Sequence, residues 1–135
     1  MDSKPIETRL LDVFAAYPAE DIAAAYLFGS VARGTARRDS DVDVGILYST
    51  DPPSGLAGLG LALEGELERA LGRDVQVVVL NRAPVDLVHR VLRDGKLIYE
   101  RDRSRRIAFE VRSRNEFFDL QPVLRRYRMF EGHGR

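Results

Sequence analysis

Two aspartates stand inside a segment that otherwise has the pattern of a β-strand, and this feature limits what the chain can fold into. Residues 41–44 read Asp-Val-Asp-Val, and an apolar run follows them through Leu47. Aspartate disfavours strands, and a buried carboxylate without a partner either destabilises the fold by several kcal/mol or binds a proton. The fold must therefore bring a group beside this strand that compensates for the two carboxylates.

Hydrophobic periodicity predicts an alternation of helices and short strands. Apolar residues at helical spacing predict helices over residues 4–17, 56–71, 84–93 and from about 102 onward. Apolar or alternating runs predict strands at 23–28, 41–47, 75–80 and 97–99, the third of them a central strand because it is rich in valine. Pro52, Pro53 and Gly55 mark a loop, and Pro122 is expected to kink or divide the last helix. The predicted fold class is α/β (α+β), a small mixed sheet with helices packed on it.

The composition fits one compact domain. With 135 residues, 44% of them hydrophobic, the chain is long enough for a real core, and we expect a single domain over 1–135 with a core at about 4–100 and a helical tail at about 102–130. The absence of cysteine excludes disulfides and thiolate metal sites. No signal-peptide pattern and no long apolar run is seen, so we expect a cytoplasmic protein without a membrane span.

Charge is balanced over the whole chain but not along it. Lys plus Arg and Asp plus Glu number 21 each, yet residues 101–135 carry ten Arg against five acids, and the rest of the chain has a net charge of −5. The basic tail has two interpretations, a solvated helix face or a docking surface for an acidic partner. Only this tail would suit nucleic acid, and we expect no direct nucleic-acid binding.

A Gly-Ser pair precedes the two aspartates at the end of an earlier predicted strand. Gly29 lets the backbone approach a ligand closely, and the N–H groups of the turn, with the Ser30 hydroxyl, can hold phosphate oxygens. Asp41 and Asp43 point to the same side of their strand, about 6.5–7 Å apart along it. Two such oxygen donors can share Mg²⁺ ions that bridge a nucleoside triphosphate, so metal and phosphate would compensate for the carboxylates.

The spacing of these residues resembles a known motif. Gly29-Ser30, ten residues, and Asp41-Val42-Asp43 resemble the Gly-Ser, ten residues, Asp-x-Asp motif of the DNA polymerase β superfamily. Residues 80–84, 91–95, 97–100 and 117–120 resemble its minimal nucleotidyltransferases, antitoxins that accompany HEPN-domain ribonuclease toxins. The resemblance covers residues from about 20 to 130. It implies a polymerase β-like fold and an adenylyltransferase that moves AMP from ATP to a tyrosine of its toxin.

The resemblance also implies roles for individual residues. Gly29 and Ser30 would hold the triphosphate, Asp41 and Asp43 would bind Mg²⁺, and Arg33 would contact phosphate or the partner.

A third carboxylate usually completes this site on a later strand. The family commonly reads Gly-Arg-x-Val-Asp-Leu-Val there, and this chain has Gln76 in place of that aspartate. Glutamine cannot take a proton from a hydroxyl at neutral pH. Asp74, two residues earlier on the same strand face, either substitutes as a catalytic residue or only caps the strand.

Three functions therefore stand side by side. The first is the Mg²⁺- and ATP-dependent protein adenylyltransferase. The second is a degenerate nucleotidyltransferase fold that neutralises its toxin by occlusion, which Gln76 favours. The third is a transferase that modifies a small molecule. A chain of 135 residues leaves little room for the acceptor-binding domain that this function needs. His89 and His133 lack metal-ligand spacing, so structural or solvent-exposed roles are expected for both.

Overall fold

A computed structural model describes residues 4–16, 21–37, 39–52 and 60–133 of the chain. For Lys4, Leu124 and residues 127–133 it describes the backbone alone. The predicted loop around Pro53 and Gly55, and the first residues of the helix predicted from position 56, lie outside the described residues.

Four short strands form one mixed sheet in the order β3-β2-β1-β4. The strands are β1 (Ile22–Phe28), β2 (Val42–Tyr48), β3 (Val75–Val79) and β4 (Lys96–Glu100). β1 is antiparallel to both β2 and β4, whereas β2 and β3 are parallel. All the predicted strands are present, with ends that differ by at most one residue.

The prediction that the valine-rich strand is central is wrong, because β3 lies at the edge of the sheet. Val75, Val77 and Val79 are buried on one face, whereas Gln76 between them is exposed. The valines therefore reflect burial on one side of an edge strand and not on both sides of a central one.

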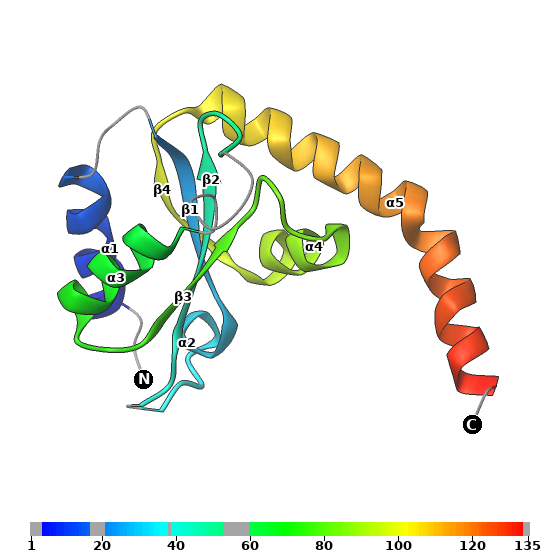
Figure 1. Cartoon of the computed structure of the whole chain (residues 1–135), viewed down its shortest axis with the longest axis horizontal. Helices are drawn as coiled ribbons and strands as arrows, with labels where there is room; N and C mark the ends of the chain where they lie inside the picture. Colours follow the sequence, from blue (N-terminus) through cyan, green and yellow to red (C-terminus); the bar gives the residue numbers. More distant parts are fainter. Residues whose placement is uncertain (1–3, 17–20, 38, 53–59, 134–135) are drawn as a thin grey trace.

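Helices cover both faces of the sheet (Figure 1). α1 (Lys4–Ala16) and α3 (Leu61–Leu71) lie on one face, and α4 (Val85–Asp94) and α5 (Arg103–His133) lie on the other. A short helix, α2 (Gly29–Arg33), connects the end of β1 to the loop before β2. The core is split accordingly into two clusters, one between the sheet and α1/α3 and one between the sheet and α4/α5.

α5 packs on the sheet and on α4 through its first half. The Tyr26 hydroxyl donates a hydrogen bond of 2.8 Å to Glu110, and Phe109 is buried. The ring of Phe117 stacks on His89 with centroids 3.6 Å apart, which gives His89 the structural role that was expected. Pro122 lies inside this helix without dividing it, and Figure 1 shows the axis turning between its orange and red parts, which agrees with a kink.

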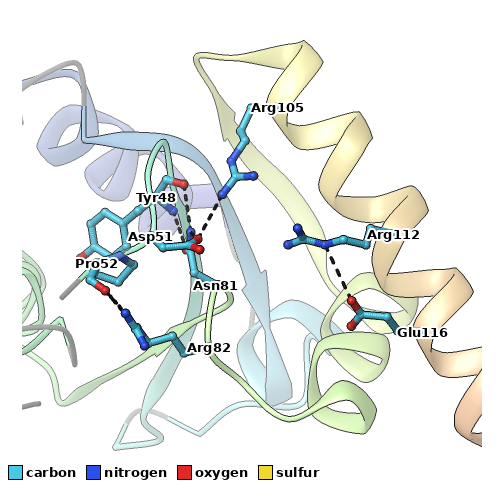
Figure 2. A network of polar contacts seen from close by, with 8 residues as sticks. All are labelled: Tyr48, Asp51, Pro52, Asn81, Arg82, Arg105, Arg112 and Glu116. Atoms are coloured by element: carbon cyan, nitrogen blue, oxygen red, sulfur yellow. Dashed lines mark hydrogen bonds and ion pairs between the residues drawn. The ribbon is translucent and has the colours of Figure 1, made fainter. Parts of the chain in front are cut away.

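A polar network ties the start of α5 to the far end of β2 (Figure 2). The Asn81 side chain accepts from the Tyr48 N–H (2.9 Å) and donates to the Tyr48 carbonyl and to Asp51 (both 3.1 Å). Asp51 is also 3.4 Å from the Arg105 guanidinium. The Asn81 hydrogen bond and the nearby arginines hold the pKa of Asp51 below its ordinary value.

No helix in the described part of the chain is both long and apolar enough to cross a membrane.

Candidate active site

A pocket of about 300 Å³ opens on the α4 side of the sheet, where β1 ends and β2 begins. It is lined by Phe28, Gly29, Arg33, Asp43, Gln76, Val78, Leu87, Arg90 and Asp94. Three predicted site residues thus meet there, Gly29, Arg33 and Asp43. Ser30 directly follows Gly29, and Asp41 is exposed just before β2.

Strand register fixes the position of Asp43 within this pocket. Its partner on β1 is Phe28 and its partner on β3 is Gln76. Residues 42 and 44 are fully buried on the opposite face, so alternation along β2 directs Asp43 toward α4. The carboxylate therefore lies between an aromatic ring on one neighbouring strand and an amide side chain on the other.

Gly29 allows the turn after β1 to approach this carboxylate closely. Its φ is +74°, in the left-handed region that favours glycine, and a Cβ atom there would collide with Oδ2 of Asp43. A side chain at this position would occupy the space in which the turn and the carboxylate face each other. The glycine predicted from sequence to permit close approach of a ligand thus also permits close approach of Asp43.

The positive charge near Asp43 does not fully compensate for the burial of its carboxylate. Burial raises the pKa of Asp43 above its ordinary value, the neighbouring Asp41 raises it further, and Arg33 lowers it. A half-buried carboxylate beside a second carboxylate is the arrangement that a divalent cation stabilises. The described residues contain no cluster of three or more His, Asp or Glu side chains suited to a metal. Asp41 and Asp43 therefore fit a cation that takes its remaining ligands from a bound phosphate group or water.

α4 supplies the wall of the pocket that the sequence analysis did not anticipate. Leu87, Arg90 and Asp94 are spaced three and four residues apart and all line the pocket. α4 lies close to the sheet because Gly45 of β2 has no side chain, and a Cβ there would be 3.2 Å from Val91. Helical spacing could have grouped these three residues, but only the topology places α4 over Asp43.

Asp94 lies among positive groups at this wall. Arg93 donates two hydrogen bonds of 2.9 Å to its carboxylate, which lowers the pKa of Asp94, and Arg33 and Arg90 lower it further. The pocket therefore combines two carboxylates with two arginines, Arg33 and Arg90, at its lining. Such a mixture suits a bound polyanion together with a cation.

The two candidates for the third acidic position are placed differently. Gln76 lines the pocket directly beside Asp43. Asp74 is exposed at the start of β3, does not line the pocket, and its carbonyl accepts a hydrogen bond of 2.9 Å from the Val42 N–H. Asp74 thus sits where its backbone begins the pairing of β2 with β3, and a catalytic role for it stays a prediction.

Arg73 holds the loop that leads into the two aspartates. Its guanidinium donates to the carbonyls of Arg37 (3.0 Å) and Ser40 (2.6 Å), the latter directly before Asp41. The Ser40 side chain accepts from the Arg37 N–H at 2.8 Å and tightens the same loop. Arg73 therefore positions the backbone that presents Asp41, a role the sequence analysis did not assign to it.

A larger groove of about 660 Å³ lies between α1 and α3, away from these residues. Arg9, Asp12, Glu66 and Arg69 line it with charges of both signs. None of the predicted site residues lies in it, and the chemistry therefore points to the smaller pocket beneath α4.

The fold and the site together define a nucleotidyltransferase. The family model for polymerase beta nucleotidyltransferases matches residues 9–104, and the chain belongs to this family. A curated relative from Shewanella oneidensis, protein adenylyltransferase MntA, is 38% identical over 74 residues, which are 55% of this chain and 51% of that protein. The match thus spans about half the length of that relative.

Solved structures give the same fold over nearly the whole chain. A toxin–antitoxin chain determined with AMP-PNP is 26% identical, with a TM-score of 0.76 over 96% of this chain and 98% of that one. A chain of the toxin–antitoxin MntA-HepT has a TM-score of 0.71 over 98% of this chain and 99% of that one, and its 22% identity shows the fold alone. The predicted fold class and family are confirmed.

Proposed function

We propose that this chain is an antitoxin adenylyltransferase that uses Mg²⁺ and transfers AMP from ATP to a tyrosine of a HEPN-domain ribonuclease toxin. The observation that carries the proposal is Asp43, a half-buried carboxylate with a raised pKa, set against the Gly29 turn and beside Asp41. A bound magnesium–triphosphate would compensate for both carboxylates. Similarity to a protein adenylyltransferase and to a toxin–antitoxin chain with AMP-PNP supports the nucleotide and the partner.

Each residue then has a defined task. Asp41 and Asp43 would hold Mg²⁺ together with a bound triphosphate, and the backbone at Gly29 and Ser30 would bind the phosphates. Arg33, which lines the pocket, adds positive charge. When bound, the metal polarises the α-phosphorus and neutralises the pyrophosphate leaving group.

The transfer is an in-line displacement at the α-phosphorus. The tyrosine hydroxyl oxygen forms a bond to this phosphorus, the bond from phosphorus to the bridging oxygen breaks, and pyrophosphate leaves with that electron pair. The products are AMP-tyrosine and pyrophosphate. Gln76 beside Asp43 accepts no proton at neutral pH, so the phenolic proton passes to water, or to Asp74 if this residue replaces the missing acid.

A second function, toxin neutralisation by occlusion alone, is favoured by one observation. Gln76 occupies the pocket position next to Asp43 where the family resemblance leads us to expect an acid. The loss of that carboxylate removes a metal ligand and a proton acceptor together. In this case the chain would bind its partner through the same fold without turnover.

The test is mass-spectrometric detection of an AMP adduct on the purified partner, with ATP and Mg²⁺. We expect an adduct with the natural chain and an increase on the order of 10²- to 10⁴-fold in rate for Gln76→Asp, the range for general-base help. Asp74→Asn serves as the companion variant. It abolishes the adduct only if Asp74 acts as metal ligand or proton acceptor in place of the missing third carboxylate. No adduct from any of the three sequences, with the partner still inhibited, would establish occlusion instead.

The proposal includes a cytoplasmic location, because ATP, the proposed substrate, is available there. Localisation of the tagged full chain by cell fractionation checks this part separately.

A further inference from the structure

We infer that the outer side of α5 is a docking surface for an acidic, amphipathic helix of the partner toxin. This inference rests on the proposed function, since it takes the toxin as the occupant. The surface, called the outer stripe, consists of Ile107, Val111, Arg114, Phe118 and Arg125.

The spacing of these residues places them on one side of α5. They follow one another at intervals of four, three, four and seven residues, and at 100° per residue this keeps them within a narrow band. They span 18 residues over five helical turns, an average repeat of 3.6 residues, so the band runs along the helix axis. Ile107, Val111 and Phe118 are 43%, 48% and 64% exposed.

A neighbouring side of α5 already makes the contacts that attach it to the body. Phe109 and Ser113 are buried, Glu110 accepts the hydrogen bond from Tyr26, and Phe117 stacks on His89. Packing on the body therefore accounts for Phe109 and Phe117 and leaves the apolar residues of the outer stripe exposed, as it does Leu120 and Val123 farther along the helix. Figure 1 shows the orange and red part of α5 extending beyond α4, away from the sheet.

The charge of the outer stripe selects the kind of partner. Its charged members, Arg114 and Arg125, are both basic and exposed. Arg114 lies 3.9 Å from Glu110, an acid of the inner side, and its side chain remains 61% exposed. An apolar helix face flanked by Asp or Glu would complement this surface in both polarity and charge.

Two other occupants fit the outer stripe less well. A second copy of this chain packed along the same stripe would bring arginines against arginines with no acid between them. Helices that lie on membranes keep their basic residues on a polar face apart from the apolar one. Here Arg114 stands between Val111 and Phe118 in the same band, which suits a protein groove.

The experiment measures binding of the full chain to the purified protein encoded beside it, and steady-state AMP transfer to that protein. Val111→Glu and Phe118→Glu should each weaken binding at least about tenfold, the size expected at the centre of an interface. Arg114→Glu should also weaken binding, with a smaller dependence of the affinity on salt. The KM for the partner should rise by the same factors while kcat is unchanged, because the pocket is not altered.

Leu61→Glu is the matched control, since Leu61 is 54% exposed on α3 at the other face of the sheet. Circular dichroism and magnesium–ATP affinity verify that each variant is folded. Equal affinity of all variants for the partner would overturn the inference and leave the proposed function intact. A natural chain that does not bind this protein at all would contradict the proposed function as well.

The same variants identify the alternative occupants. Self-association of the natural chain in sedimentation, lost in Phe118→Glu, would assign the outer stripe to a second copy. Binding to phosphatidylglycerol vesicles, lost in the same variant, would assign it to a membrane surface. Either result would overturn the assignment to an acidic partner helix.

Discussion

The two faces of the sheet are made by the same strands but have different tasks. Toward α1 and α3, the strands β2 and β3 present buried aliphatic residues and, at the end of β2, the partly buried Tyr48; the aliphatic residues are Val42, Val44, Ile46, Val75, Val77 and Val79. Toward α4, the alternate positions of the same strands carry Asp43, Gly45, Gln76 and Val78. The strand period of two lets the α1/α3 face hold one core cluster, while the α4 face combines the other core cluster with the pocket.

The comparison shows why the aspartates are tolerated in a strand. Along β2 and β3 the α1/α3 face packs a core cluster that does not involve Asp43, so the pocket face can hold a carboxylate whose burial is unfavourable in the free protein. α4 covers this face only in part, since Gly45 lets it lie close while Asp43 stays open to the pocket. Stability and chemistry are therefore separable by substitution, face by face.

The largest expected effect is the loss of AMP transfer when Asp43 on the pocket face is substituted. Asp43→Asn removes one carboxylate of the proposed metal site, and a loss of about 3 kcal/mol in transition-state stabilisation corresponds to at least about 10²-fold in AMP transfer. The thermal midpoint should not fall, because the amide has no charge to desolvate. Asp86→Asn, at an exposed aspartate in the first turn of α4, is the control. Full activity of Asp43→Asn would mean that the pocket is not the active site.

On the face toward α1 and α3, a substitution is expected to lower stability and to leave magnesium–ATP affinity unchanged. Leu67 of α3 is fully buried against the sheet, so Leu67→Ala should lower the free energy of unfolding by about 2–5 kcal/mol. Magnesium–ATP affinity, measured well below the midpoint, should be unchanged. Leu61→Ala, at a position 54% exposed, should shift stability by no more than about 0.5 kcal/mol. A loss of ATP affinity in folded Leu67→Ala would show that the two faces are coupled.

The separation of the faces also explains what the sequence could and could not predict. Alternation and helical spacing located the strands and helices, because each pattern is local. The edge position of β3 could not be read from its valines, since burial of one face under α3 gives the same run as burial of both. Asp41, Asp43 and Gly29 were predicted because their spacing along the chain is itself the motif.

The remaining pocket residues depend on contacts between distant segments. Arg90 and Asp94 reach the site only because α4 crosses over β2 at Gly45. Arg73 acts through two backbone carbonyls more than thirty positions away in sequence. Arg73 and Asp94 fall in segments that resemble the family, but the local sequence assigns neither of them, nor Arg90, to this pocket.

Arg73 offers a smaller perturbation that reaches the pocket through the backbone. Arg73→Met keeps most of the aliphatic stem but removes both donors to the loop before Asp41, where hydrogen bonds from a charged group contribute about 1.5–3 kcal/mol. We expect magnesium–ATP affinity to fall roughly tenfold, by less than the effect of Asp43→Asn. Arg69→Met, at an exposed arginine in the last turn of α3, is the control.

Recovery of ATP affinity by Arg73→Lys distinguishes positioning of Asp41 from general stabilisation of the loop before it. Arg73→Lys retains the charge and can reach one of the two carbonyls, so it should recover part of the ATP affinity. A lower thermal midpoint in Arg73→Met with unchanged magnesium–ATP affinity would mean that the loop is stabilised but Asp41 is not positioned by it.

The smallest expected effect is a pH dependence that belongs to the pocket face alone. Because burial and Asp41 raise the pKa of Asp43 in the folded state, the folded protein binds more protons than the unfolded chain between the ordinary and the raised pKa. The slope of unfolding free energy against pH is therefore negative in that window. Relative to Asp43→Asn, the natural chain should gain stability as pH falls from 7 toward about 4, the ordinary value for aspartate.

Urea unfolding of both chains with a chelator present, from pH 7.5 to 3.5, measures this difference and cancels the other carboxylates. With magnesium and ATP added at pH 7.5, the natural chain should become the more stable of the two, because the cation favours the charged carboxylate and the complex binds only the folded state. A stability difference that is constant with pH would mean that burial of Asp43 costs nothing. In that case its charge would not be what draws a cation into the pocket.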